Sequence, residues 1–496
     1  IHEESILKLI EASRHLTVRR KSARRESLKS LWLTIGSLSK TFLERPRSTA
    51  NVSDKVQVTE AFLAQYFREE LRAKEPVSSL GPTERMIVLL KALGNAGLAT
   101  DEAVLADLEA ILLGKMASDA SVGLRTQAVY ALRKVAPKRA SVALVRRLLL
   151  PLLVNEKEDT ELRIAAYIVL MKTRPEPAFI RLILNKVTTE KNEQLRSFVL
   201  SHMRAFVDNP SLCYSEAAKN ISRILESIPR KDFGAQYSQS YKMALNKNKN
   251  VFLMGNLLWT KDGFLPRAGN IRLQVDLSGE EFDLAEFGMR SQGLQDLLEK
   301  LLGPEGSFYS ADTLEELLKR YEESVSEKDN DFATYFKLFD DEVAYSPLDL
   351  NLKNVIRDGF IGIQSKWVDI FLKGKPWRSS VRKTIYLDSI MRVPSTLGLF
   401  FSVNMTSTVY AHLNFQMSSG NAPPGLFATN GFNLESRIRP VVKSQHEIQV
   451  GVENSFLFSS VSAKLKIDLP RNDQEYIFNI HYSTTDKNPT GKKRDG

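Results

Sequence analysis

Cysteine is almost absent from this sequence of 496 residues, in which Cys213 is the only one. A single cysteine excludes an internal disulfide and any cluster of cysteine ligands for a metal. A lack of disulfides is typical of proteins from reducing compartments. A segment of a secreted protein whose disulfides lie elsewhere would show the same composition. Because it falls in a helical stretch, Cys213 is interpreted as a small buried hydrophobic residue.

Long apolar runs are also absent. No stretch of about 18 uncharged apolar residues occurs, so the sequence predicts no membrane-spanning helix. The chain opens at Ile1 in an amphipathic helical pattern, without an initiator methionine or a signal peptide. From this start we expect a fragment or a processed subunit.

Catalytic and metal-binding motifs are missing as well. The six histidines are scattered, and the H-E-x-x-H, G-x-S-x-G, P-loop and G-x-G-x-x-G patterns do not occur. His202 lies in an apolar helical run and is interpreted as a packed histidine. We therefore predict that the protein is not an enzyme and has no catalytic residues, no metal site and no covalent cofactor.

The formal net charge is +10, and part of the excess is local. Five Lys and Arg residues cluster within 19–25, a pattern that suits a polyanion, an acidic receptor or a processing protease. An exposed helix end or loop would explain the cluster equally well. A second basic stretch, Gly491–Arg494, is a candidate processing site in a polar tail over 483–496, which we expect to be flexible.

The first part of the chain, 1–229, predicts a helical solenoid. Apolar residues at helical spacing indicate helices over 3–16, 25–44 and 54–73. An arginine then opens an apolar helical run four times, at intervals of 33 to 40 residues, at Arg85, Arg125, Arg163 and Arg196. Second helices are expected between these runs, over 104–116, 141–154, 177–187 and 211–228. Helix pairs that recur at this spacing are typical of HEAT-like α-solenoids.

After the solenoid the pattern changes to strict alternation, which predicts β-structure. Apolar residues alternate with polar ones over 271–277, and a hairpin is expected over 256–267 with its turn near Asp262 and Gly263. We interpret 230–383 as a small sheet with inserted helices, expected within 291–373, and with an acidic linker over 326–342. Residues 384–482 predict long antiparallel strands, each with one apolar face. The fold class is therefore α+β and multidomain.

The apolar faces of the long strands must be covered, and the sequence leaves two ways open. Helices or a second sheet could fill the space with side chains, as in an ordinary core. Alternatively, the solenoid could surround the sheet edges and leave an apolar cavity, where lipid would cover the strands. Burial of apolar surface, at about 25 cal/mol per Å², favours acyl chains there as much as side chains.

Several separated segments resemble the large lipid transfer proteins, the family of vitellogenin (lipovitellin), apolipophorin, apolipoprotein B and microsomal triglyceride transfer protein. The similar segments occur in the family's order and span roughly 80–488; those most similar to vitellogenins and their arthropod relatives lie in the final strands. They read LKALGNAG, ELRIAAYIVLMKTRP, NEQLRSFVLSHM, FGAQYSQSYKM, NLLWTKDGFLPR, FGMRSQGLQDLL, VPSTLGLFFSVNMTSTVYAHL and SAKLKIDLP.

The resemblance implies a right-handed, horseshoe-shaped solenoid around antiparallel sheets that line an apolar cavity. It implies non-covalently bound phospholipid and neutral lipid in a secreted yolk precursor that serves as a nutrient reservoir, in haemolymph or plasma and in yolk. The family's N-terminal β-barrel and further C-terminal sheet are missing from this chain, so these segments of the same precursor are expected partners. A homodimer, and a lipoprotein receptor bound through regions outside this chain, are further partners to consider.

Two alternatives remain at this point. The chain could belong to another branch of the family: an apolipophorin-like carrier, a clotting-protein relative or the intracellular triglyceride transfer protein. It could also be a HEAT-like scaffold that binds proteins or nucleic acid through its basic surface. The scaffold alternative leaves the long strands unexplained, and in the lipid-carrier interpretation no nucleic acid is expected.

The candidate lipid-contacting residues are those on the uniformly apolar strand faces. They are Leu397, Leu399, Phe401, Val403, Val409, Leu413, Phe415, Ile448, Val450, Val452, Val461, Leu465 and Ile467. Three N-x-S/T sequons make Asn51, Asn220 and Asn404 candidate glycosylation sites.

Overall fold

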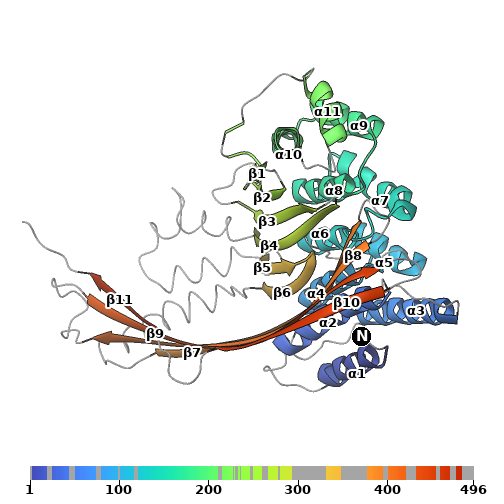
Figure 1. Ribbon diagram of the computed structural model, residues 1–496. Helices are drawn as coiled ribbons and strands as arrows, with labels where there is room; N and C mark the ends of the chain where they lie inside the picture. Colours follow the sequence, from blue (N-terminus) through green and yellow to red (C-terminus); the bar gives the residue numbers. More distant parts are fainter. Residues whose placement is uncertain are drawn as a thin grey trace, which may run out of the picture.

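The computed structural model confirms the predicted class, a helical solenoid followed by open antiparallel sheets (Figure 1). It describes residues 3–18, 25–43, 51–73, 80–98, 101–116, 121–210, 215–226, 228, 233–234, 236–245, 250–259, 266–277, 280–292, 331–347, 377–394, 400–420, 432–453, 458–469 and 476–482.

The helices of the solenoid agree with the sequence periodicity to within a few residues. In chain order they are α1 (Glu3–Val18), α2 (Arg25–Leu43), α3 (Asn51–Arg72), α4 (Pro82–Ala96), α5 (Glu102–Leu112), α6 (Val122–Ala131), α7 (Val142–Val154), α8 (Thr160–Lys172), α9 (Pro177–Thr188), α10 (Glu193–Asp208) and α11 (Ser215–Leu225). A short 3-10 helix, η2 (Arg139–Ser141), precedes α7.

Local sequence signals explain where these helices begin. Asp101, Ser121, Asp159 and Asn192 each accept a backbone N–H with the side chain at a helix N-terminus, as capping residues do. Proline opens α4 and α9 at a position where its missing N–H costs nothing. Among the described residues, no helix is both long enough and apolar enough to cross a bilayer.

The four helices opened by the repeated arginines (α4, α6, α8 and α10) follow one another along the inner side of the solenoid (Figure 1). Their apolar faces pack on neighbouring helices, and the core so formed buries large side chains completely, among them Trp32 of α2, Phe67 of α3, Tyr167 of α8 and Phe198 of α10. The predicted stacking of helix pairs is therefore where the main hydrophobic core lies.

The first sheet is a six-stranded antiparallel meander in the order β1-β2-β3-β4-β5-β6. Its strands are β1 (Gln239–Ala244), β2 (Val251–Leu258), β3 (Ala268–Leu277), β4 (Glu280–Gln292), β5 (Asp331–Leu338) and β6 (Asp341–Pro347).

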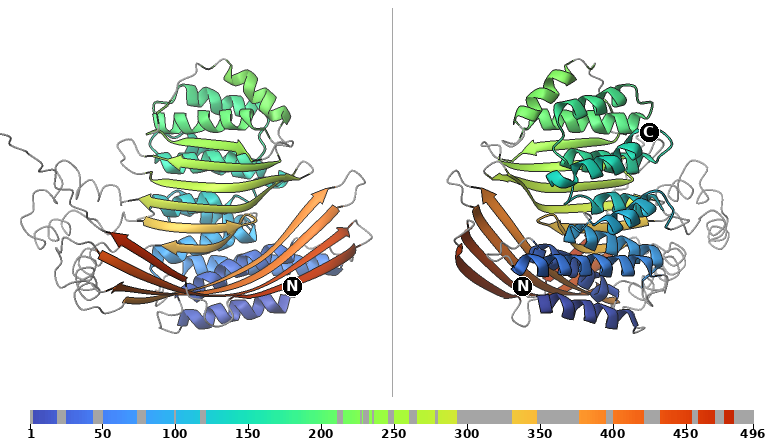
Figure 2. Two further views of the ribbon diagram at one scale, coloured as in Figure 1. Left: turned by 60° about the vertical axis from the view of Figure 1, so that its left-hand side comes forward. Right: turned by 90° about the vertical axis from the view of Figure 1, so that its right-hand side faces the viewer.

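The second sheet contains much longer strands in the order β10-β9-β8-β7, with β11 also paired to β9. They are β7 (Trp377–Pro394), β8 (Phe400–Gly420), β9 (Phe432–Glu453), β10 (Phe458–Leu469) and β11 (Tyr476–Tyr482). At about 3.3 Å per residue, strands of this length extend well beyond the solenoid on one side, as the two views in Figure 2 show.

The two sheets occupy different sides of the molecule. The first sheet stands beside the inner helices, with α10 against β1 and with α2 and α4 against β6 (Figure 1). The second sheet curves below it, and β7 contacts both α2 and β6. Contacts at β6 and β7 therefore join the sheets, and each sheet retains one broad face that none of the described helices covers in Figures 1 and 2.

Some sequence predictions differ from the structure. The expected acidic linker over 326–342 is wrong, because β5 and β6 occupy most of it from Asp331 onward. Strand β7 begins at Trp377, before the predicted start of the second sheet at 384. The helices expected within 293–330 and 350–373, the Asp262 and Gly263 turn, Cys213, the basic residues 19–24 and the tail with Gly491–Arg494 lie outside the described residues.

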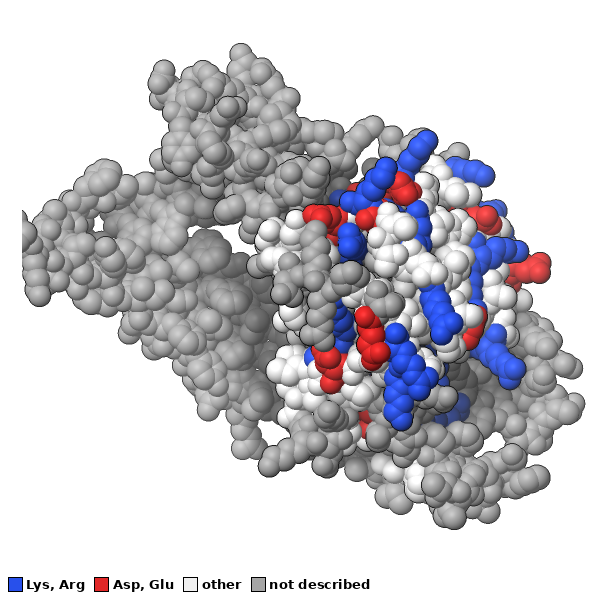
Figure 3. Space-filling view, turned by 90° about the horizontal axis from the view of Figure 1, so that it is seen from above, with Lys and Arg blue, Asp and Glu red and all other residues white. Residues whose placement is uncertain are grey.

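The described surface of the solenoid carries charges of both signs. Figure 3 views the molecule from above, onto the end formed by α9, α10 and α11, and shows Lys and Arg side chains spread over the described part of this end with Asp and Glu between them. Several of these charges form exposed pairs, such as Arg146 with Glu176 at 2.6 Å and Lys186 with Glu156 at 2.8 Å. The described surface is therefore mixed in sign.

Candidate functional site

The first sheet turns its mainly polar face toward the helices, the reverse of the arrangement in an ordinary globular core. Phe252, Met254 and Leu258 are apolar residues on this inner face. The buried polar and charged side chains on the same face outnumber them: they are Ser240, Lys242, Asn256, Gln274, Asp276, Glu286, Arg290, Lys337 and Glu342.

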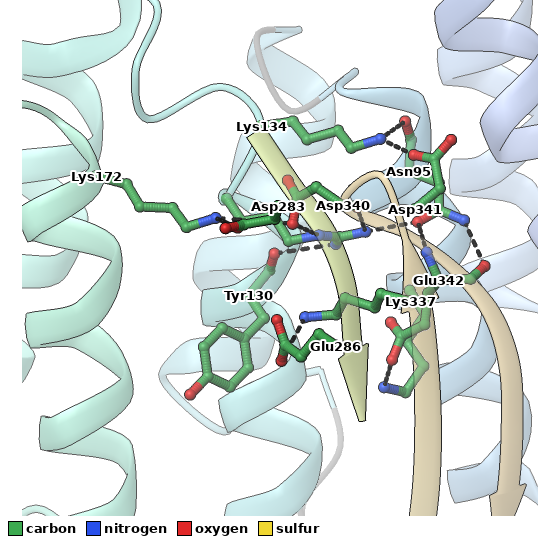
Figure 4. Close-up of polar contacts among 12 residues, drawn as sticks. Asn95, Tyr130, Lys134, Lys172, Asp283, Glu286, Lys337, Asp340, Asp341 and Glu342 are labelled. Atoms are coloured by element: carbon green, nitrogen blue, oxygen red, sulfur yellow. Dashed lines mark hydrogen bonds and ion pairs between the residues drawn. The ribbon is translucent and has the colours of Figure 1, made fainter. Parts of the chain in front are cut away.

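Ion pairs connect this polar face to the inner helices (Figure 4). Arg290 of β4 reaches Glu161 of α8 at 2.7 Å, and both side chains are buried. Lys91 of α4 forms a fully buried pair with Glu342 of β6. Buried charges are tolerated when they are paired and hydrogen-bonded, so these pairs determine which face of the sheet meets the helices.

The turn between β5 and β6 is the most charged part of this contact. Phe339 and Asp340 occupy its two central positions with φ of 51° and 59°, the left-handed values that a tight hairpin turn requires. Asp340 lies 3.7 Å from Arg133, and Asp341 pairs with Lys134. The acidic tip of the hairpin is thus held by the two basic residues that follow α6.

Nearby cations keep the buried carboxylates of Glu286 and Glu161 ionised. Burial alone would raise the pKa of Glu286, but Lys337 and Arg272 outweigh it and lower that pKa to about 2. Burial opposes ionisation of Glu161 in the same way, yet Arg290 and Arg267 lower its pKa overall. The layer between sheet and helices is therefore charged on both sides at neutral pH.

The outer face of the first sheet is apolar and exposed. Antiparallel register aligns Tyr241, Gly255, Ile271 and Phe287 across four strands. The described side chains there are exposed by up to 57%, the value for Ile271. The exposed large apolar residues on this face are Tyr241, Met243, Leu257, Ile271, Phe287 and Met289. A contiguous apolar surface of this kind marks an interaction site.

The second sheet repeats this arrangement. Its register pairs Val403 with Val450 and Val450 with Val461, so apolar positions of β8, β9 and β10 fall on one face. Phe401, Ile448 and Val450 are 45%, 41% and 47% exposed on that face. Ser402, directly after Phe401 and on the opposite face, is buried. The large apolar side chains on this face are thus exposed near the start of β8, whereas Ser407, further along the same face, is buried.

The structure brings most of the candidate lipid-contacting positions together. By strand register a single face contains Phe401, Val403, Val409, Leu413, Phe415, Ile448, Val450, Val452, Val461, Leu465 and Ile467. Val403 and Val452 are half-buried. Leu397 and Leu399 lie outside the described residues.

Sequence reasoning missed the outer face of the first sheet as a candidate site. The alternation over 271–277 indicated an apolar face, but it did not show that this face points away from the helices. The same alternation in β1, where Tyr241 and Met243 flank Lys242, could have extended the prediction.

The other singled-out residues lie in varied surroundings. Asn51 is the first residue of α3, Asn220 is half-buried in α11, and Asn404 is half-buried within β8. His202 accepts or donates a 2.8 Å hydrogen bond with the Tyr167 hydroxyl and stacks on Phe198, which agrees with a packed histidine. In the described parts of the chain, no group of three or more His, Cys, Asp or Glu side chains could hold a metal ion.

Comparison with known proteins identifies the same two units. Residues 3–204 match the family model described as the vitellogenin TPR domain. Residues 236–468 match the one described as the vitellinogen open β-sheet. Together these ranges include most of the solenoid, the first sheet and most of the second.

Curated relatives extend the similarity over the chain. Vitellogenin-6 of Caenorhabditis elegans is 24% identical over 398 residues, 74% of this chain and 23% of that protein. Vitellogenin of Acipenser transmontanus is 25% identical, over 71% of this chain and 21% of that protein. Apolipoprotein B-100 of Rattus norvegicus is 27% identical over 46% of this chain and 5% of its own length. The chain thus spans about a quarter of the vitellogenins it matches.

A solved structure of lipovitellin, one that concerns its lipid–protein interactions, shares the fold. It superimposes with a TM-score of 0.56 at 20% identity, over 94% of this chain and 46% of that one. A solenoid beside open sheets with exposed apolar faces defines the class of large lipid transfer proteins. Within that class, the chain belongs to the vitellogenin/lipovitellin-like family.

Proposed function

We propose that this chain binds lipid non-covalently on the open apolar faces of its two sheets, as part of a secreted vitellogenin-like carrier. The observation that supports this most directly is the reversed orientation of the first sheet. The charged face of this sheet forms ion pairs with the helices, such as the pair of Arg290 with Glu161. Its apolar face, with Ile271 and Phe287, is left without a protein cover among the described residues.

Energetics favour acyl chains as the cover for these faces. Apolar surface gains about 25 cal/mol for each Å² removed from water, and hydrocarbon chains adapt to a long, curved sheet. Phospholipid and neutral lipid are the ligands proposed, and no covalent cofactor is needed. The yolk role as a nutrient reservoir, and the extracellular setting in haemolymph or plasma, follow from the family.

Further partners belong to the same proposal. The chain spans about a quarter of the vitellogenins it matches. A β-barrel before it and a further sheet after it, in one precursor, are therefore the expected neighbours. A homodimer and a lipoprotein receptor that binds outside this chain complete the proposed set.

The test is to purify the chain from a eukaryotic secretory host and to quantify co-purified lipid by thin-layer chromatography and mass spectrometry. Val450→Asp on β9 places a charge on the apolar face, and we expect it to lower bound lipid per folded molecule severalfold. Gln445→Asp is the matched control, because Gln445 is exposed on the opposite face of the same strand. A wild-type preparation without lipid, or equal lipid in both variants, would refute the proposal.

A scaffold that binds nucleic acid is the second candidate, and the net charge of +10 is its only specific support. The described outer surface mixes both signs (Figure 3). A salt-dependent nanomolar affinity for nucleic acid would favour the scaffold, whereas we expect weak binding that disappears at physiological salt.

A further inference from the structure

A cavity of about 740 Å³ lies on the opposite side of the first sheet from its open apolar face. It is bounded by the segment after α6, the C-terminal end of α8, the start of α9, α10, α11, β1 to β4 and the β5–β6 turn, with one residue each from α2 and β7. Its volume is within the usual range for small-molecule sites. Because it adjoins the polar side of the sheet, it is separate from the surface proposed above.

The cavity wall is predominantly basic. It contains three acidic residues, Glu281, Asp283 and Asp340, against seven basic ones. The basic residues are Lys40, Arg133, Lys134, Lys172, Arg174, Lys242 and Arg272. Some of these cations are already paired, as Lys134 is with Asp341 behind the wall. Basic side chains nevertheless outnumber acidic ones on the lining itself, and an anion is the complementary ligand.

Three cations on this wall retain hydrogen-bonding capacity. Arg272 donates to Asp283 at 3.1 Å, whereas its other terminal nitrogen donates to the Met254 sulfur at 3.4 Å as its one hydrogen bond among the described residues. Its Nε has no hydrogen-bond partner within the described structure, and sulfur is a weak acceptor. Lys172 is 3.5 Å from Asp283 and 3.7 Å from Asp340, and Lys242 is 3.7 Å from Glu281. These separations exceed the roughly 2.7–2.9 Å of a good charge-assisted bond.

Positive potential at this wall also acts on its histidine. Burial, together with the nearby Arg272 and Lys242, lowers the pKa of His202 to about 3. His202 is therefore neutral at physiological pH and contributes no charge to the wall. The remaining wall is apolar and comes from helices and strands: Ile168, Met171, Ile180, Phe206, Ile221 and Phe282.

We propose that this cavity binds one single-chain amphiphile with an anionic head group, either a carboxylate or a phosphate monoester. The head group is held by Arg272, with Lys172 and Lys242 beside it. The hydrocarbon chain lies along Met171, Phe206 and Ile221. A free long-chain fatty acid and a lysophosphatidic acid share this chemistry.

The test is a fluorescence titration of the delipidated chain with cis-parinaric acid, followed by displacement with lysophosphatidic acid. We expect one site per chain whose affinity falls about tenfold in Arg272→Gln, the loss expected for one charge-assisted bond. Arg147→Gln is the control, because Arg147 is an exposed arginine on α7 outside the cavity. The methyl ester of cis-parinaric acid should bind weakly to wild type and show no dependence on Arg272.

The competition identifies the source of the head group. Displacement by lysophosphatidic acid at lower concentration than oleate supports a phosphate ligand, and the reverse supports a fatty acid. If Arg272→Gln fails to fold, Met171→Trp replaces it, because the larger side chain should block the site without removing a charge. Unchanged affinity in the folded cavity variant, or equal affinity for the methyl ester, would overturn the proposal. Val450→Asp should leave this site intact, which separates its failure from that of the sheet surfaces.

Discussion

At the scale of single residues, the repeated arginines explain why the solenoid repeats as it does. Arg125 donates from Nε to the carbonyl of Leu112, and Arg163 does the same to Leu153, each at the end of the preceding helix. Arg85 donates to the carbonyl of Ala73 in the corresponding place. Carbonyls at a helix end lack partners within the helix, so each arginine completes the helix before its own.

Each of these arginines also pairs with an acid, and the Arg163 pair with Glu190 is the most buried. Arg163→Met should leave Glu190 buried without its partner and destabilise the solenoid by about 3–5 kcal/mol. The measurement is urea unfolding followed by helical circular dichroism. Arg146→Met is the control: its partner Glu176 is 56% exposed, and the pair should contribute less than about 1 kcal/mol. Equal losses in the two variants would contradict this role for Arg163.

Acid should weaken the contact between sheet and helices. The pKa of Glu286 is about 2 in the fold against an ordinary 4.5, so its stabilising effect is complete above pH 4.5 and is lost as the pH falls toward 2. The pKa of His202 is about 3 in the fold against 6.5. Its contribution to the stability of the fold is therefore also lost as the pH falls from 6.5 toward 3. We expect unfolding midpoints to fall from pH 7 to pH 3. In Glu286→Gln the unfolding midpoint should fall less steeply below pH 4.5. If the midpoint falls as steeply as in wild type, Glu286 is not a source of the acid sensitivity.

At the scale of elements, α10 closes the free edge of the first sheet. The Gln194 side chain accepts the backbone N–H of Ser238 at 2.6 Å, and Ser201 accepts that of Ser240 at 2.9 Å. Further along the helix, Asn209 donates to the carbonyl of Lys242 at 2.8 Å. An unprotected edge strand invites pairing with other chains. Side chains of α10, with Asn209 directly after it, therefore satisfy backbone groups at the edge of β1 that a neighbouring strand would otherwise bond.

Removing these bonds should loosen β1 locally. Ser201→Ala combined with Asn209→Ala leaves one N–H and one carbonyl without partners, which costs about 1–3 kcal/mol for each buried group. Hydrogen exchange should therefore accelerate in β1, with little change in α4 or α6. Asn185→Ala on the exposed side of α9 is the control and should change neither. Protection of β1 equal to wild type would show that the edge bonds are dispensable.

The sequence predicted elements well wherever the signal was local. Apolar spacing of 3.6 residues and the recurrence of Arg85, Arg125 and Arg163 located the helices, because both depend on neighbouring residues. The β5–β6 hairpin was mistaken for a linker because its acidic residues, Asp340 to Glu342, read as solvated. Their partners are Arg133, Lys134 and Lys91, more than 200 residues away in the chain, and no local pattern reveals them.

At the scale of the whole molecule, the direction of each sheet face decides the function. Alternation shows that β3 has an apolar face and a polar face. The sequence pattern is the same whether the apolar face points toward the helices or away from them. Gly288 contributes to the outcome: a Cβ there would lie 2.2 Å from the Tyr335 ring, which lies across it to donate to Glu286 at 2.7 Å. Close packing of the polar face on the helices turns the apolar face outward.

Because the apolar face of the first sheet points outward, a charge placed on it should have a smaller effect on stability than a charge placed in a hydrophobic core. Ile271 is 57% exposed, so Ile271→Asp should change the stability of the delipidated protein by less than about 0.5 kcal/mol. In lipid-loaded protein the same variant should lower Tm, because a ligand that binds only the folded state stabilises it and the charge weakens that binding. Leu182→Asp is the control, since Leu182 is 52% exposed on α9, away from both sheets, and should leave the lipid-dependent rise in Tm unchanged. Strong destabilisation of the delipidated Ile271 variant would mean that protein, rather than lipid, covers this face.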